Sequence, residues 1–160
     1  MDGIDEDEFG PLNIGTRAQV VEILYNIQGC PSVSGSVSYP DVKKGDEWYD
    51  AVLWGTQNKV VLGYGTGEFG PEDPITREQL ALVLMRYTGD LGLNNSARAN
   101  INGFKDYKKV ADYATDAMRW AVATKLIQGN DLNQLNPGSD ASRAEIAAIL
   151  ERYAKTILGK

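Results

Sequence analysis

The sequence predicts an all-α fold in which helix–loop–helix repeats lie in a pseudo-threefold arrangement around a shared helical core. The first observation is an arginine that directly follows a hydroxyl residue in Thr16-Arg17, Thr76-Arg77 and Ser142-Arg143. Because each unit has only one apolar stripe per helix, three units must share a core. The second observation is that each arginine is followed by apolar residues at the i, i+3, i+4, i+7 spacing of an amphipathic helix: Val20, Ile23, Leu24 and Ile27; Leu80, Val83, Leu84 and Tyr87; Ile146, Ile149, Leu150 and Tyr153.

Caps and breakers place the individual elements. Thr16, Thr76 and Ser142 are each followed three residues later by Gln or Glu, which predicts a capping box at three helix starts. Glycines and prolines between 63 and 74 predict a compact irregular loop rather than a strand. Two polar stretches are expected to be exposed linkers, at 30–38 and 89–103. Helices are expected near residues 16–28, 46–59, 76–88, 112–126 and 142–157.

The internal repeats also cover the segments before these helices. Loops 3–17, 63–77 and 129–143 each begin with Gly and carry Phe or Leu followed by Pro. Farther upstream only two copies remain, 38–63 and 102–129, which share an Asp-Ala pair and a Trp. We therefore expect one domain over residues 1–160, made of a half repeat (repeat 1, 1–30) and two whole repeats (repeat 2, 31–89; repeat 3, 90–160).

Composition excludes several classes of partner. The net charge of −6 argues against a nucleic-acid backbone or an anionic membrane surface as a partner. No apolar run is long enough to predict membrane insertion. The chain has no histidine and a single cysteine, Cys30, so the usual zinc sites, His-based triads and internal disulfides are excluded.

No cofactor, metal site or catalytic residue is predicted. Gly65, Gly67 and Gly70 have the spacing of a dinucleotide fingerprint, but they follow a helical segment and lead into Pro71, so the strand–turn–helix context is missing. The acidic run at 5–8 lacks the spaced ligands of a calcium loop. The acids form no repeated pair of the kind a glycosidase needs, so we expect no enzyme.

Residues 39–87, YPDVKKGDEWYDAVLWGTQNKVVLGYGTGEFGPEDPITREQLALVLMRY, resemble an S-layer homology repeat, a bacterial cell-wall anchoring module. Residues 104–153 are similar but looser, and residues 3–28 match only the loop and the Thr-Arg helix. The resemblance implies a non-catalytic module on the bacterial cell surface or S-layer. It also implies grooves between repeats that bind secondary cell-wall polysaccharide, commonly ending in pyruvylated N-acetylmannosamine.

The resemblance suggests roles for the recurring residues. A pyruvyl ketal leaves a carboxylate on the sugar, which a guanidinium and free backbone N–H groups at a helix start would hold. Indole faces could stack on the sugar ring, and glycines would let the backbone approach it. The expected ligand-binding residues are Arg17, Arg77, Arg143, Trp48, Gly63, Gly129, Trp54 and Trp120.

Purely structural roles compete with these. The arginines could instead pair with carboxylates such as Asp73 or Asp140. Trp54 and Trp120 share a helix face with an alanine and are more typical of a core, which makes Trp48 the better sugar candidate. Two acids, Asp41 and Asp106, are interpreted as structural turn or cap residues.

The half repeat raises a question of completeness. If each groove takes its walls from neighbouring repeats, one groove should be open, and we expect Arg77 and Arg143 to be functional rather than Arg17. The oligomeric state is not predicted, but the missing helix could be supplied by another chain. This leaves a protein-interaction or self-assembly module as the alternative function.

Overall fold

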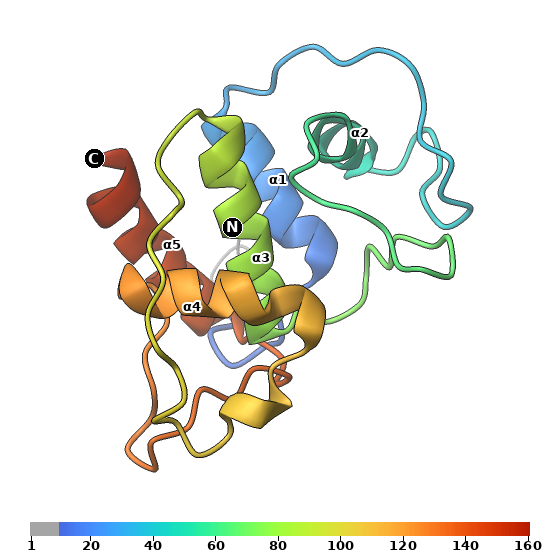
Figure 1. Cartoon of the computed structure of the whole chain (residues 1–160). Helices are drawn as coiled ribbons and strands as arrows, with labels where there is room; N and C mark the ends of the chain where they lie inside the picture. The colour runs from blue at the N-terminus through green and yellow to red at the C-terminus, as the bar shows by residue number, and fades with distance from the viewer. Residues whose placement is uncertain (1–9) are drawn as a thin grey trace.

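The computed structural model describes residues 10–160, and Figure 1 shows its helices. The first nine residues, which include the predicted acidic run and the beginning of loop 3–17, lie outside the described part. Residues 10–160 contain isolated β-bridges but no strand, so the predicted all-α class is confirmed. The α-helices are α1 (Arg17–Ile27), α2 (Tyr49–Gln57), α3 (Arg77–Asp90), α4 (Thr115–Ala123) and α5 (Arg143–Tyr153).

Three short elements complete the list, and two helices are shorter than predicted. The short elements are the 3₁₀ turns η1 (Tyr107–Lys109) and η2 (Asp112–Ala114) and the π-helical turn η3 (Ala154–Leu158). The expected helices 46–59 and 112–126 are trimmed at both ends, to α2 and α4. Both end in the same way, because Lys59 and Lys125 adopt left-handed conformations at φ 57° and 62° that turn the chain back on the helix.

The core is built by α1, α3 and α5, which begin with the three predicted capping boxes. Their apolar stripes face one another, and Leu24, Leu84 and Ile146 are fully buried. The Tyr87 ring lies 6.0 Å from the Tyr153 ring, measured between centroids, so aromatic side chains of α3 and α5 meet in the interior.

A closed ring of backbone hydrogen bonds joins the loops before the three core helices. Gly15 N–H donates to the Ala141 carbonyl (2.9 Å), Ala141 N–H to the Ile75 carbonyl (2.8 Å), and Ile75 N–H to the Gly15 carbonyl (3.0 Å). Each repeat therefore bonds to both others at equivalent positions. The predicted pseudo-threefold arrangement rests on this ring.

The outer helices cover the core helices in a fixed order. Helix α2 of repeat 2 packs against α1 of repeat 1, and α4 of repeat 3 packs against α3 of repeat 2, as Figure 1 shows for α4 crossing α3. Among residues 10–160, α5 has no equivalent outer helix. Accordingly, Leu150 is only half-buried, whereas its counterparts Leu24 and Leu84 are fully buried.

Candidate functional site

Arg17 extends from the start of α1 into the loop of the next repeat. Its Nε donates to the Phe69 carbonyl and its Nη2 to the Leu62 carbonyl, both at 2.9 Å. The guanidinium carbon lies 4.6 Å from the Tyr64 ring centroid and 4.9 Å from that of Phe69, which is cation–π geometry. The residue is only 8% exposed, so the loop of repeat 2 encloses it.

Arg77 repeats this arrangement one unit later. Its Nε donates to the Leu135 carbonyl (2.9 Å) and its Nη2 to the Gln128 carbonyl (3.3 Å). It differs in one partner, because Nη1 lies 3.1 Å from a carboxylate oxygen of Glu145. Arg17 and Arg77 therefore each donate hydrogen bonds to the loop of the following repeat.

Arg143 is the third member of the set. Its side chain is buried, with 6% of the residue exposed, and its backbone N–H donates to the Asn13 carbonyl at 2.8 Å. The loop that corresponds to those around Arg17 and Arg77 belongs to repeat 1 and lies mostly within the first nine residues, outside the described part.

The prediction of free backbone N–H groups at the helix starts is wrong. At the start of α1, Arg17 N–H donates to the Asp73 carbonyl, Ala18 N–H to the Pro71 carbonyl, and Gln19 N–H to the Thr16 hydroxyl. The equivalent groups of α3 and α5 are bonded in the same way. An anion in the grooves must therefore be held by side chains or by loop backbone.

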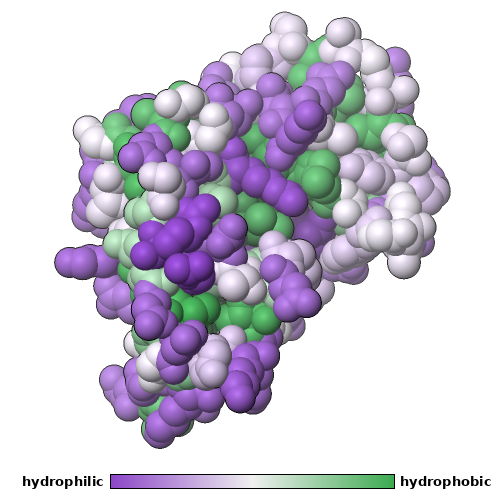
Figure 2. All heavy atoms as spheres, viewed as in Figure 1, coloured by the Kyte–Doolittle hydropathy of each residue, from purple (hydrophilic) through white to green (hydrophobic). Residues whose placement is uncertain are grey.

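A groove of about 390 Å³ opens beside Arg17, and we call it the Arg17 groove. Its walls come from Arg17 of repeat 1, the loop at 61–65, one face of α3, and Tyr113 of repeat 3. On the face of the molecule viewed in Figure 2, hydrophobic residues lie next to hydrophilic ones near the middle. Apolar and polar surfaces together suit an amphipathic ligand such as a sugar.

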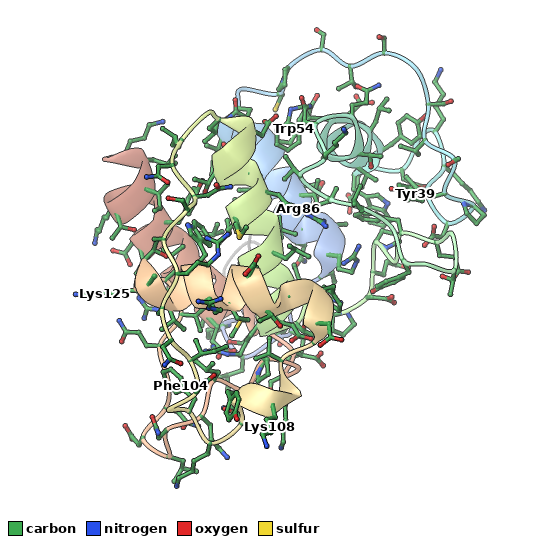
Figure 3. All side chains as sticks on the ribbon, in the orientation of Figure 1. Tyr39, Trp54, Arg86, Phe104, Lys108 and Lys125 are labelled. Atoms are coloured by element: carbon green, nitrogen blue, oxygen red, sulfur yellow. The ribbon has the colours of Figure 1, made fainter. Side chains whose placement is uncertain are left out.

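A second cation, Arg86, lies in the same groove. It projects from α3 (Figure 3), and within residues 10–160 it forms no hydrogen bond or ion pair. Burial lowers the pKa of Arg86, and the nearby charge of Arg17 lowers it further. In the described part of the chain the Arg17 guanidinium bonds only to carbonyls, so the groove holds two cations and no described carboxylate paired with either.

A smaller groove of about 280 Å³ lies beside Arg77, the Arg77 groove. Asn130 takes the position of Tyr64, and Glu145 takes that of Gln79. Among the described residues, the groove contains the acids Asp140 and Glu145 and no aromatic side chain. It is lined by Arg77, Gln128, Gly129, Asn130, Gln134, Asn136, Ser139, Asp140 and Glu145.

The two predicted glycines line these grooves, but their neighbours explain them on structural grounds. A Cβ at Gly63 would lie 2.5 Å from the Tyr39 ring, and one at Gly129 would lie 2.5 Å from the Phe104 ring. Gly63 N–H also donates to the Tyr39 hydroxyl at 3.0 Å. Aromatic rings of the protein itself occupy the space that a side chain at Gly63 or Gly129 would need.

The tryptophans lie outside both grooves. Trp54 and Trp120 are 5% and 0% exposed, so they belong to the core and neither ring is available to a sugar. Trp54, labelled in Figure 3, belongs to α2, and its ring centroid lies 5.8 Å from that of Tyr25 on α1 and 6.2 Å from that of Tyr87 on α3. Trp48 precedes α2, is half-buried against the core, and lines neither groove.

Asp41 and Asp106 have the structural role that the sequence suggested. Asp41 accepts backbone N–H bonds from Phe69 and Gly70, and Asp106 accepts them from Leu135 and Asn136. Burial alone would raise the pKa of Asp41, but the Phe69 and Gly70 bonds outweigh it and the pKa is lowered. These carboxylates hold the loops into which Arg17 and Arg77 extend.

The structure differs from the expectation that the half repeat would leave the Arg17 groove open. The Arg17 groove takes its outer wall from Tyr113 of repeat 3, which is present. Within residues 10–160, no residue of repeat 1 lines the Arg77 groove at the corresponding place. The premise that the Arg17 groove is the incomplete one is therefore wrong. Helix exchange with another chain stays a prediction.

The groove residues that sequence reasoning missed include Tyr64, Arg86 and Tyr113. A signal existed for Arg86, because Arg152 occupies the same position in repeat 3, nine residues after the capping arginine. Tyr113 had no such signal, since it enters the groove from another repeat.

Together, the fold and grooves define a module of helical repeats with pockets at the junctions between repeats. Residues 38–81 and 103–147 match the S-layer homology domain, and the chain belongs to this family. It is 26% identical, over 98% of its length, to the surface-layer 125 kDa protein of Lysinibacillus sphaericus, and covers 13% of that protein.

Other relatives carry the same region in different proteins. Identity is 26% over 94% of the chain with an amylopullulanase of Thermoanaerobacterium thermosulfurigenes, and over 90% with a cellulosome-anchoring protein of Acetivibrio thermocellus. The chain covers 8% and 33% of these proteins, respectively. It therefore spans a third or less of each relative described.

Proposed function

We propose that the chain is a non-catalytic anchoring module that attaches a protein to the bacterial cell wall by binding secondary cell-wall polysaccharide. Membership of the S-layer homology family supports anchoring. The names of two relatives, a surface-layer protein and a cellulosome-anchoring protein, support a place on the cell surface. The enzymes among the relatives match over only a small share of their length, which supports a role apart from catalysis.

The observation that carries the binding proposal is the pair of guanidinium groups in the Arg17 groove. A half-buried cation without a partner is costly unless an anion neutralises it. The protein has a net charge of −6, yet within residues 10–160 neither Arg17 nor Arg86 is paired with a carboxylate. A sugar-borne carboxylate, such as the pyruvyl ketal of N-acetylmannosamine, would supply the missing charge.

The rest of the groove suits the sugar ring. Tyr113 is 58% exposed at the groove, and Leu82 lines the same space, so a pyranose face would meet apolar surface there. Gln79 and the Tyr113 hydroxyl offer polar groups for ring hydroxyls. Binding would thus combine one charged contact with a stacked ring.

Calorimetric titration with the methyl glycoside of pyruvylated N-acetylmannosamine, and with the same glycoside lacking pyruvate, tests the proposal. We expect binding only with the pyruvyl group, and a loss of about 10- to 100-fold in Arg86→Gln, the size of one charged hydrogen bond. Arg152→Gln is the matched control, because Arg152 bonds to the Leu126 carbonyl and lines neither groove. Equal affinity for both glycosides, or unchanged affinity in Arg86→Gln, would overturn it.

A further inference from the structure

We propose that Glu145 blocks anion binding in the Arg77 groove and that the neutral Gln79 leaves the Arg17 groove open. This inference rests on the proposed function and assigns the difference between two similar grooves to one residue position. Gln79 and Glu145 are both the third residue of a core helix, α3 and α5, and each lines the groove of the preceding repeat's arginine.

The two arginines are positioned alike but neutralised differently. Both bond through Nε and Nη2 to a pair of loop carbonyls, at Phe69 and Leu62 or at Leu135 and Gln128. Only Arg77 also has a carboxylate, with its Nη1 3.1 Å from Glu145 Oε1. An incoming carboxylate would have to displace Glu145 and leave two negative charges side by side.

The other charged residues of the two grooves also favour anion binding in the Arg17 groove over the Arg77 groove. The Arg17 groove adds Arg86, while the Arg77 groove adds Asp140. Arg152, the counterpart of Arg86, donates instead to the Leu126 carbonyl at 3.0 Å and does not line the groove. The Arg17 groove therefore carries two cations, whereas the Arg77 groove has one cation against two acids.

The position can be changed without disturbing the helix start. Glu145 closes a capping box by accepting from the Ser142 N–H, and Gln79 does the same with the Thr76 N–H. Gln at this position also caps α1, so both side chains maintain the box in this chain. Exchanging Glu and Gln alters the charge beside the arginine and keeps the cap.

The test uses four versions of the whole chain, titrated with the pyruvylated glycoside: wild type, Glu145→Gln, Gln79→Glu and the double variant Glu145→Gln/Arg77→Gln. We expect Glu145→Gln to gain one binding site relative to wild type. We expect Gln79→Glu to weaken the Arg17 site by about tenfold or more, by one lost charged contact. The arginine Nε–Hε resonances identify the groove, because the gained site must shift the Arg77 signal and disappear in Glu145→Gln/Arg77→Gln.

The outcomes separate the two proposals. Wild type that binds, with no gained site and no Arg77 shift in Glu145→Gln, overturns this inference and leaves the proposed function standing. Wild type whose Arg77 signal already shifts with the glycoside also overturns it. No binding in wild type but binding in Glu145→Gln contradicts the proposed function and the open Arg17 groove, and leaves only the block by Glu145 standing. No binding in any version overturns both proposals.

Discussion

Thr88 on α3 and Tyr153 on α5 join their hydroxyl groups across the core, with 2.9 Å between oxygens. Both residues are fully enclosed, at 0% and 1% exposed. Thr88 also donates to the Leu84 carbonyl at 2.7 Å, which leaves its oxygen to accept from Tyr153. A single directed polar contact thus ties two core helices from different repeats.

Removing either hydroxyl should have unequal effects. Thr88→Val leaves the Tyr153 hydroxyl buried without a partner, which costs about 1–3 kcal/mol. Tyr153→Phe leaves Thr88 bonded to Leu84 and should cost about 1 kcal/mol or less. Urea unfolding of both variants and the double variant checks this; a larger loss in Tyr153→Phe would contradict the assigned direction of the bond.

Alkaline pH should act through the same tyrosine. Burial raises the pKa of Tyr153 from 10.0 to about 12. Because the folded pKa is the higher one, the stabilisation is complete below pH 10 and is lost as pH rises toward about 12. Unfolding free energies measured across this range should fall less steeply in Tyr153→Phe than in wild type, and identical slopes would refute the expectation.

Acid should weaken the loop of repeat 2 through Asp41. Its pKa is lowered from 3.8, since the Phe69 and Gly70 N–H bonds outweigh burial, so its stabilisation is present above that pH and is lost as pH falls. Asp41→Asn should lower the unfolding free energy at neutral pH by about 1–3 kcal/mol and flatten its fall in acid. Glu47→Gln, an exposed acid nearby, is the control and should behave like wild type.

Gly63 and Gly65 offer a matched pair within one loop. Ala at 63 would place a Cβ 2.5 Å from the Tyr39 ring and 2.7 Å from the Glu68 carbonyl, while Ala at 65 meets nothing within 4 Å. We expect Gly63→Ala to destabilise by about 1–3 kcal/mol and Gly65→Ala by less than about 0.5 kcal/mol. Thermal unfolding measures both, and equal melting temperatures would show that the loop yields freely at Gly63.

Local patterns were enough to predict the helices. Capping boxes at Thr16, Thr76 and Ser142 and the apolar stripes placed α1, α3 and α5 within a few residues, because caps and amphipathic spacing depend on near neighbours. The ends of α2 and α4 were missed, since the left-handed residues that end them, Lys59 and Lys125, are not glycines.

The site was predicted only in part, because it depends on how the repeats close. The repeated motif identified Arg17 and Arg77 as equivalent residues. It did not show that each hydrogen-bonds to the loop of the following repeat. That order decides which groove lacks a wall, and it brings Tyr113 to Arg17 across nearly a hundred residues of sequence. The burial of Trp54 and Trp120, in contrast, agrees with the core role that their spacing from an alanine on the same helix face indicated.

The ring formed by Gly15, Ile75 and Ala141 limits how such repeats can multiply. Each of these residues gives its one N–H to one neighbour and takes one from the other, so no donor remains for a fourth unit. Stacked solenoids lengthen by adding repeats at an open end, but this module has no such end at its axis. A protein in need of a longer anchor would have to duplicate the whole trio.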